Sequence, residues 1–462
     1  MPELIVDLTE DKKTSVDCTI TSIGNESDKR IAYMNYACIN GHLGIVNGLL
    51  KNGFDVYSRD SSNNTALHHT AANGNVEIVK KLLENGASPY LANMFHFTPL
   101  HLASLNGHSQ AVKEFVNHKV YLNFETNAGE NSLELAAING NLQTVKELLN
   151  AGATAYRHGE DRMYCNALDK LPSKLSDNHI EIVLEILKSH PYPLHEAVYK
   201  IQQAEVNVII RKLIQSGISP NLQDQYGDTA LHIAVIDDGN FHALVELLKH
   251  EVNTEIKNDY KATPLEFAIE YNQNDIVEEL LKYGANPNCL SINKYWGETT
   301  LLHIACCKGN VTMVKILLKH GANVNGLAHN NMSALHSTLY LNGSESRNQI
   351  IKELLENGAN VNIKDDENET SLHHATNENV DEIPENLFQE ILKKSCDLNI
   401  KSTDGGNTAL HYASKAGRES FVKYLLNYGA DKNIRDYDGC NTLETALTYK
   451  QKSVIKVIIF NI

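Results

Sequence analysis

The chain has 462 residues and a formal net charge of −16 at pH 7. Such an acidic chain lacks the basic face that nucleic-acid binding normally needs, so no nucleic-acid partner is expected. No uncharged apolar run is long enough for a membrane span, and the start MPELIVDLTEDKK lacks the basic-then-apolar order of a secretory signal. Eight cysteines without a C-x-x-C pair favour free thiols in a reducing compartment, and hence a cytoplasmic or nuclear protein.

Residues 64–87 have the pattern of two short helices joined by a turn. Thr65 can cap the first helix, because its hydroxyl can accept a hydrogen bond from a free backbone N–H group. Gly74 can end that helix, since a residue without Cβ adopts a left-handed turn at little steric cost. The second helix carries aliphatic residues at helical spacing, namely Ile78, Val79, Leu82 and Leu83. So small a hairpin cannot bury its apolar faces alone, and it must stack on further copies.

The same pattern recurs along the chain at a nearly fixed interval. With the capping position as marker, it begins near residues 32, 65, 98, 131, 166, 192, 229, 263, 300, 333, 370, 408 and 441. The motif T-P-L-H-x-A, then G, then L-L-x-x-G-A resembles the ankyrin repeat, a turn followed by two helices. This resemblance covers roughly residues 29–462 and implies an all-α solenoid of stacked helix-turn-helix units with hairpin fingers. We expect its leucine pairs to be buried between layers: Leu82–Leu83, Leu148–Leu149, Leu247–Leu248 and Leu317–Leu318.

Two irregular places divide the chain. Residues 1–28 are polar, charged and short of helical periodicity, so we expect a flexible N-terminal tail. The pattern weakens at Pro172, which removes a backbone donor and shortens a first helix, and the interval from 166 to 192 is only 26 residues. We therefore expect a first stack at 29–190, with an irregular last repeat, and a second stack at 191–462 with a C-terminal cap. Either a hinge or a fixed bend at the junction fits the sequence.

Histidine occupies the fourth position of the frame in eight repeats: His68, His101, His195, His232, His303, His336, His373 and His411. The ankyrin resemblance implies a structural role for this imidazole, which links its own turn to the neighbouring turn by hydrogen bonds. One side chain per repeat gives a spacing of roughly 10 Å, the packing distance of helices, which is too far for a shared metal ion. We expect no metal site and no cofactor.

Catalytic motifs are missing from the sequence, which contains no P-loop, dinucleotide-binding fingerprint or nucleophile elbow. An enzyme would have to use the irregular segment 153–195, where Cys165, His158, His179 and His190 offer a cysteine–histidine arrangement. No spacing between these residues supports such a site. We therefore expect a non-enzymatic protein, and an enzyme with a cryptic Cys/His site is the alternative.

Protein recognition is the function that remains. The resemblance implies that finger tips and first helices line one concave side, where the fold leaves residue types free to vary. Aromatic side chains next to acids occur there, and tyrosine and tryptophan dominate the energetics of protein interfaces. Alternatively, neighbouring fingers pack against each other with their aromatic side chains. The candidate protein-binding residues are Met94, Phe95, Phe97, Leu105, Asn106, Tyr226, Asp228, Tyr260, Glu270, Tyr271, Tyr295, Trp296 and Tyr437.

The N-terminal tail holds a short β-prone run flanked by acids, LIVDLTED, which resembles a SUMO-interaction motif. The resemblance implies that Ile5, Val6 and Leu8 add a strand to the sheet edge of a SUMO-like modifier. Alternatively, these residues pack on the first repeat or have no role.

Residue usage rich in Asn, Ile and Lys indicates an AT-rich genome. Ankyrin proteins that intracellular bacteria direct into host cells are similar in this respect, as are many eukaryotic ones. The sequence therefore predicts a scaffold for partner proteins of unknown identity, with a host-directed effector as one form of it.

Overall fold

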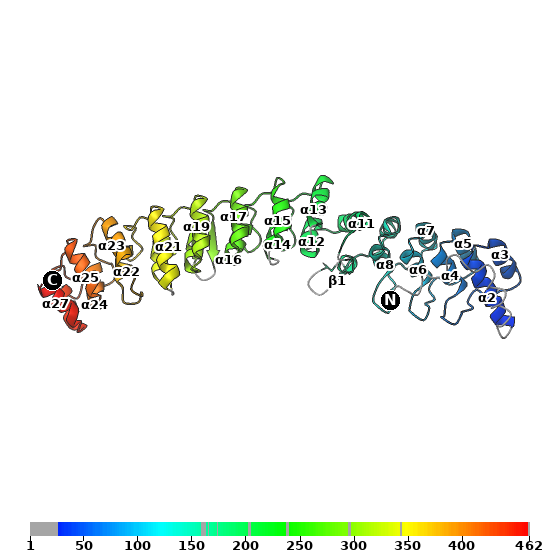
Figure 1. Ribbon diagram of the computed structural model, residues 1–462, viewed down its shortest axis with the longest axis horizontal. Coiled ribbons are helices and arrows are strands. Elements are labelled where there is room, and N and C mark those ends of the chain that lie inside the picture. Colours follow the sequence, from blue (N-terminus) through cyan, green and yellow to red (C-terminus); the bar gives the residue numbers. More distant parts are fainter. Residues whose placement is uncertain are drawn as a thin grey trace. The chain divides into compact units, whose positions relative to one another are not determined.

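The computed structural model describes residues 26–158, 163–164, 166–172, 174–201, 205–236, 240–293, 297–341 and 344–460. Ile5, Val6, Leu8, Cys165, Tyr295 and Trp296 lie outside these residues. In the described part, 26 α-helices follow one another as thirteen pairs (Figure 1), and this confirms the expected all-α solenoid. No helix in this part is long and apolar enough to cross a membrane.

The chain divides into two compact units, 1–216 and 217–462. In the first unit the helix pairs are α2 (Glu26–Ile39) with α3 (Leu43–Lys51), α4 (Ala66–Asn73) with α5 (Val76–Glu84), α6 (Pro99–Leu105) with α7 (Ser109–Asn117), α8 (Ser132–Ile138) with α9 (Leu142–Asn150), α10 (Asn166–Asp169) with α11 (Asp177–Lys188), and α12 (Pro193–Lys200) with α13 (Val206–Gln215). Between α9 and α10, β1 (Arg157–His158) pairs antiparallel with β2 (Met163–Tyr164).

The second unit begins with α14 (Ala230–Ile236) and α15 (Phe241–Leu248), followed by α16 (Pro264–Glu270) and α17 (Asn274–Lys282). A finger of two antiparallel strands, β3 (Leu290–Asn293) and β4 (Gly297–Thr300), precedes α18 (Leu301–Cys307) and α19 (Val311–Lys319). The remaining elements are η1 (His329–Asn331), α20 (Ala334–Leu339), α21 (Ser344–Glu356), α22 (Ser371–Thr376), α23 (Glu385–Lys394), α24 (Ala409–Lys415), α25 (Glu419–Asn427), α26 (Thr442–Thr448) and α27 (Lys452–Phe460).

The repeat formed by α6 and α7 shows how the sequence produces one layer. Thr98 has extended backbone angles, and its side chain accepts the N–H of His101, so it caps α6. Pro99 follows at the first helical position, where its missing N–H costs no hydrogen bond. Gly107 ends the turn with a φ of +75°, a value that suits glycine. The amphipathic helix α7 then buries Ala111, Val112 and Phe115.

Stacking places like helices next to each other. In the first unit α4 lies against α6 and α6 against α8, while α5 lies against α7 and α7 against α9. Neighbouring fingers are also joined, since Met94 donates its backbone N–H to the carbonyl oxygen of Ser62 at 3.1 Å. Each apolar helix face is therefore covered by the next repeat, as expected for a repeat protein.

Helix α11 has a neighbouring helix on each side, because it packs on α9 and on α13 within the first compact unit. The division into stacks at 29–190 and 191–462 stays a prediction. The expected shortening before Pro172 is confirmed, because α10 ends at Asp169 after four residues. Helix α2 starts at Glu26, within the expected tail of residues 1–28.

The leucine pairs are only partly buried as expected. The first member is buried in every pair, as Leu82, Leu148, Leu247 and Leu317 show. Leu248 is buried as well, but Leu83, Leu149 and Leu318 are half-buried. Consecutive helix positions point about 100° apart, so a helix covered along one stripe hides one leucine and leaves the other at its edge.

Candidate functional site

Each finger tip is a two-residue turn, and the polar side chain of the residue before it accepts hydrogen bonds from the backbone of the turn. Asn93 accepts the backbone N–H groups of Phe95 and Phe97 on its Oδ1, both at 3.0 Å. Asp60, Asp224, Asn258 and Asp365 hold their own fingers in the same way. The side chains at the tip take no part in this turn, so the fold leaves them free for recognition.

In the first unit the apolar tip lies next to residues used for packing. Met94 and Phe95 are 55% and 59% exposed at adjacent positions. Phe97 is only half-buried at the base of this finger, where its ring meets His101 edge-on at 6.0 Å between centroids. Leu105 is half-buried too, and exposed Asn106 donates to the carbonyl oxygen of Ala72 in the preceding repeat. Met94 and Phe95 are thus the exposed apolar candidates among the described residues of this unit.

In the second unit the tips carry tyrosine. Tyr260 is 75% exposed, and Tyr226 is exposed to a smaller extent. Asp228, expected at the rim of the surface, is instead buried. Its Oδ1 accepts the side-chain N–H of Asn258 from the next finger at 2.7 Å, so it joins two fingers.

At the C-terminal end of helix α16, Glu270 and the residue that follows the helix, Tyr271, are both exposed. Glu270 lies 3.4 Å from the ammonium of Lys308, which comes from the next repeat. The ring of Tyr271 stacks on Phe267 with centroids 6.1 Å apart. These side chains therefore present an aromatic surface with a partly neutralised acid beside it.

Tyr437 is in contact with the preceding finger. It is 64% exposed, yet a Cβ atom added to Gly406 would lie 2.6 Å from its Cδ1. The ammonium of Lys401 lies 4.7 Å from the centroid of the same ring. One face of the Tyr437 ring therefore packs on the preceding finger, which is the alternative interpretation of these aromatic side chains.

Six frame histidines have the structural role that the resemblance implied. Nδ1 of His101 accepts the backbone N–H of Thr98 at 3.0 Å, so the proton lies on Nε2, which donates to the carbonyl oxygen of Phe124 at 2.8 Å. Five other imidazoles reach the next finger in this way, from His68 to Phe97, His232 to Ala262, His303 to Met332, His373 to Ile400 and His411 to Cys440. Burial lowers the pKa of His68, His303 and His373 to about 4, which keeps these rings neutral.

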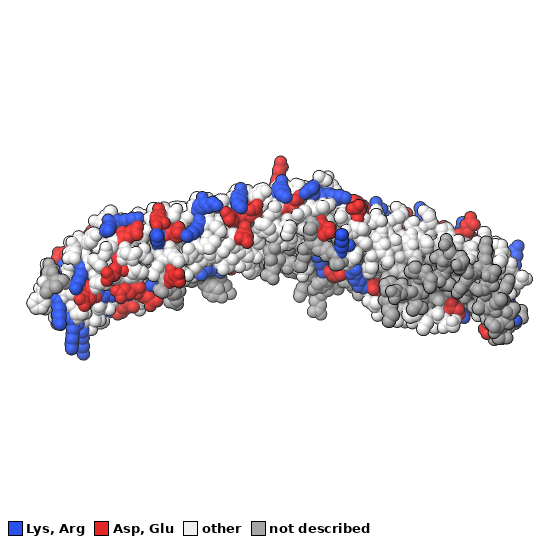
Figure 2. Space-filling view, viewed as in Figure 1, with Lys and Arg blue, Asp and Glu red and all other residues white. Residues whose placement is uncertain are grey.

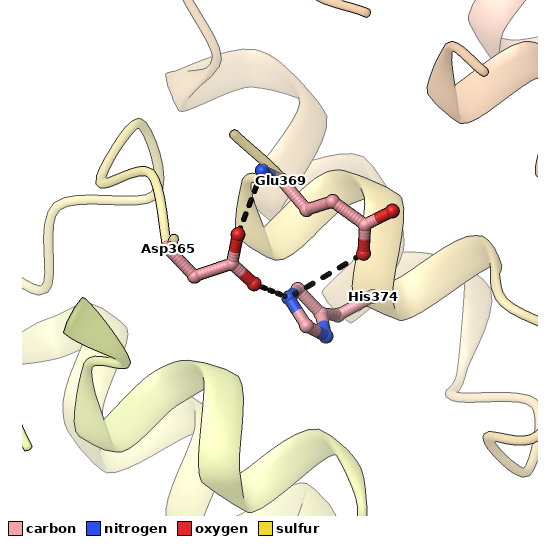
Figure 3. A group of neighbouring side chains, drawn as sticks. All are labelled: Asp365, Glu369 and His374. Atoms are coloured by element: carbon pink, nitrogen blue, oxygen red, sulfur yellow. Dashed lines mark hydrogen bonds and ion pairs between the residues drawn. The ribbon is translucent and has the colours of Figure 1, made fainter. Parts of the chain in front are cut away.

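One buried group of potential ligands was not expected from the sequence. Asp365 and Glu369 of one finger converge on His374 of α22 (Figure 3), with one donor atom of each residue within 4.8 Å of the others. The signal in the sequence is the pair His373–His374, in which only the first histidine fits the frame. The second histidine, His374, contacts the finger acids but does not occupy a frame position.

Two of the residues of the cryptic enzyme site have structural partners. Nδ1 of His179 lies 2.7 Å from Ser176 Oγ, and its Nε2 lies 3.2 Å from the carbonyl oxygen of Ile138. The ring of His190 lies 4.8 Å from that of Tyr156, and burial lowers its pKa. The side chain of His158 lies outside the described residues. A hollow of about 610 Å³ between α9 and α11 has Lys146, Tyr156, Glu185 and Lys188 in its wall, but neither histidine.

Negative charge is concentrated in one part of the second unit. Figure 2 shows acidic side chains gathered where α22 and α23 lie. The exposed acids of this segment are Asp366, Glu367, Glu378, Asp381, Glu382 and Glu385. A surface of this kind attracts a positively charged partner and disfavours a negatively charged one.

The sequence matches a family model described as ankyrin repeats (3 copies) at residues 4–93, 90–157, 194–291, 288–365, 341–436 and 382–461. Over 97 residues the chain is 36% identical to the nuclear factor NF-kappa-B p105 subunit of Rattus norvegicus, a match that covers 19% of this chain and 9% of that protein. Over 54 residues it is 44% identical to a putative ankyrin repeat protein of fowlpox virus (strain NVSL), covering 12% of this chain and 8% of that protein.

Among solved structures, the chain is similar to the crystal structure of the ankyrin repeat domain of Bcl-3, described as a member of the IkappaB protein family. The sequence identity is 22% and the TM-score 0.35, over 64% of this chain and 98% of that chain. The two sequence relatives are matched over less than a tenth of their own lengths, at 9% and 8%.

Proposed function

Since the chain belongs to the ankyrin repeat family, whose repeats are generally protein–protein interaction modules, we propose that it is a non-enzymatic scaffold that binds partner proteins at its finger tips and first helices. Members of this family are typically not enzymes. The partners are proteins rather than nucleic acids, because the chain is strongly acidic.

The observation that carries this proposal is the apolar tip of one finger. Met94 and Phe95 are both more than half exposed, at 55% and 59%, although neither supports the turn that holds the finger. Neighbouring fingers of the same unit have Ser61–Ser62 and Asn127–Ala128 at these two positions. A serine pair therefore suffices for the fold, and adjacent exposed apolar side chains are typical of a surface that a partner covers.

The second unit offers a different surface chemistry. Its tips expose Tyr226, Tyr260 and Tyr437, and exposed acids lie near α22 and α23. Tyrosine supplies contact area at low entropy cost, and acids guide the approach of a basic partner. We propose that this unit binds a basic protein segment.

Two further expectations stay proposals. Ile5, Val6 and Leu8 bind a SUMO-like modifier as an added strand, which titration of the modifier with the chain and with a triple alanine variant would test. A host-directed effector role stays a prediction from residue usage.

We also propose that the chain acts in the cytoplasm or nucleus, where thiols stay reduced. Burial raises the pKa of the Cys38 thiol to about 11, and Cys306 is buried as well. Thiols of this kind stay protonated and unreactive, as suits core residues.

The test of the finger surface is quantitative capture of proteins from a cell lysate. The double variant Met94→Ser, Phe95→Ser copies the Ser61–Ser62 tip and should keep the fold, because the turn depends on Asn93. We expect a partner captured by the parent chain to be depleted at least about tenfold, the loss that follows from removing one interface anchor.

The matched control changes the neighbouring tip, with Asn127→Ser and Ala128→Ser. This variant should capture the same partner as the parent chain does. Equal capture by all three proteins, each with parental circular dichroism, would contradict a role for Met94 and Phe95.

A further inference from the structure

Three donor atoms from one repeat converge at the base of its finger. Nε2 of His374 lies 2.7 Å from Oδ2 of Asp365 and 3.8 Å from Oε2 of Glu369. Figure 3 shows both carboxylates directed at the same edge of the imidazole ring. One nitrogen and two oxygens within 4.8 Å of one another can be ligands of a single cation after small shifts.

The other polar atom of each side chain is held by a separate partner. Nδ1 of His374 lies 2.7 Å from the hydroxyl oxygen of Tyr340, which comes from the preceding repeat. Oδ1 of Asp365 accepts the backbone N–H of Glu369 at 2.8 Å. Oε1 of Glu369 accepts the hydroxyl of Tyr412 from the following repeat at 2.5 Å. Such outer partners fix the orientation of ligands in metal sites.

The three side chains are withdrawn from water. Asp365, Glu369 and His374 are 8%, 4% and 6% exposed. Burial raises the pKa of Glu369, while Asp365, although also desolvated, keeps a lowered pKa through the hydrogen bond from His374. Two carboxylates this close in a poorly solvated place repel each other, and a divalent cation between them removes that repulsion.

An independent observation comes from His336, a frame histidine that is fully buried. Its Nδ1 is anchored on Ser333, as in the other repeats, but its Nε2 has no hydrogen-bond partner among the described residues. In four repeats the partner of Nε2 is the residue before the next cap, and that residue is Glu369 here. Because its anchor is the same, this Nε2 faces the finger that carries the acids. The ring lies edge-on to His374, with centroids 4.9 Å apart.

The first unit provides a natural comparison. Asp60 and His69 occupy the places of Asp365 and His374 and are 2.8 Å apart, but Asn64 stands where Glu369 does. The frame histidine there, His68, has the usual carbonyl partner. A hydrogen-bonded Asp–His pair is therefore a normal part of this fold, and the second carboxylate is the addition.

We propose that Asp365, Glu369 and His374 bind one divalent cation of the Zn²⁺ type. One imidazole nitrogen with two carboxylate oxygens suits Zn²⁺, whereas Ca²⁺ takes six to eight oxygen ligands. For binding, the ring proton of His374 moves from Nε2 to Nδ1, which then donates to the hydroxyl oxygen of Tyr340, and the lone pair of Nε2 faces the cation. Three protein ligands leave a fourth position, which a water molecule can take.

The experiment is calorimetric titration of the metal-free full chain with Zn²⁺, repeated with Co²⁺ to record the absorption spectrum of the bound ion. We expect one site that is tighter than any other on the chain. Glu369→Gln keeps the shape of the side chain and removes its charge, and it should weaken this site at least about 100-fold. Tyr412→Phe removes only an outer partner and should weaken it about 10- to 100-fold.

Two controls separate the proposed site from surface binding. Glu369→Asn copies Asn64 and should lose the site while circular dichroism stays parental. His69→Gln alters the pair in the first unit and should leave the tight site unchanged. The same Zn²⁺ affinity and stoichiometry in the parent and both Glu369 variants would mean an adventitious ion only. Absence of a tight site in the parent would show that the group is a hydrogen-bonded link between repeats.

Discussion

Arg418 is buried at the start of α25 and donates from Nη1 to the carbonyl oxygen of Ala375, 43 residues away, at 2.6 Å. Its Nη2 donates to the carbonyl oxygens of Asn377 and Val380. The carbonyl of Ala375 belongs to the last turn of α22, and the other two belong to the connection between α22 and α23, which is longer than in other repeats. One guanidinium therefore donates to three backbone acceptors, and its bonds to Ala375 and Val380 are buried.

Replacing Arg418 by Met should destabilise the second unit by roughly 2–4 kcal/mol, because Met keeps much of the apolar stem but removes the hydrogen bonds to those carbonyl oxygens. The measurement is the shift of the denaturant midpoint followed by circular dichroism. Arg435→Met is the matched control, since Arg435 is exposed and its ion pair with Glu444 is worth less than about 1 kcal/mol. Equal shifts for both variants would show that the buried acceptors do not need Arg418.

Stability should fall in mild acid because of the frame histidines. The pKa of His68, His303 and His373 is lowered to about 4, chiefly by burial, whereas an unfolded histidine titrates near 6.5. Between these values the unfolded chain binds protons that the folded chain does not. The histidine contribution is therefore complete above about pH 6.5 and is lost as the pH falls toward about 4. Denaturant midpoints measured from pH 7.5 to pH 4.5 test this.

A histidine-to-glutamate variant separates imidazoles from carboxylates in that titration. Glu266 occupies the same frame position in a natural repeat and accepts the backbone N–H of Thr263 at 2.9 Å. His373→Glu should therefore fold, and its stability should depend less steeply on pH between 6.5 and 4.5 than that of the parent chain. An unchanged slope would exclude His373 as a source of acid sensitivity.

The sequence was sufficient for features that are local in the chain. A cap such as Thr98 and its His101 lie three residues apart, so the motif contains the whole interaction within α6. The hydrogen bond between Asp228 and Asn258 could not be predicted, because the two residues lie 30 positions apart and only the stacked fingers bring them together. Arg418 gave no signal for the same reason.

The buried group of Asp365, Glu369 and His374 could be predicted from the sequence only in part. Asp365 and Glu369 are close to it in sequence, and a helix start places all three on one side. What the sequence does not reveal is the pair of tyrosines, Tyr340 and Tyr412, which come from the repeats before and after. Stacking therefore supplies the outer partners, while the motif supplies the inner ones.

Truncating a leucine pair should show which face of the second helix is covered. Leu82→Ala should cost about 2–5 kcal/mol, because Leu82 is fully buried and its loss leaves a cavity. Leu83→Ala, one position further, should cost about 1 kcal/mol, since Leu83 already contacts water. Thermal unfolding of both variants gives the comparison. A larger loss for Leu83 would mean that the helix faces its neighbour differently from the structure.

The contact between Gly406 and the ring of Tyr437 shows whether this ring packs on the neighbouring finger or is open to a partner. Gly406 has a φ of +68°, and a Cβ there would lie 2.6 Å from Cδ1 of Tyr437. Gly406→Ala should destabilise the second unit by about 1–3 kcal/mol, in part through backbone strain and in part through this contact. Tyr437→Ser should remove the contact but not the strain.

The double variant Gly406→Ala, Tyr437→Ser therefore measures how firmly the two fingers are joined. If the Tyr437 ring packs on Gly406 in solution, the double variant should be more stable than the sum of the single changes by about 0.5 kcal/mol or more, as is usual for residues in contact. Denaturant unfolding of all four chains closes the cycle. Additive effects would mean that the ring leaves Gly406 at no cost, and then both faces of Tyr437 are open to a partner protein.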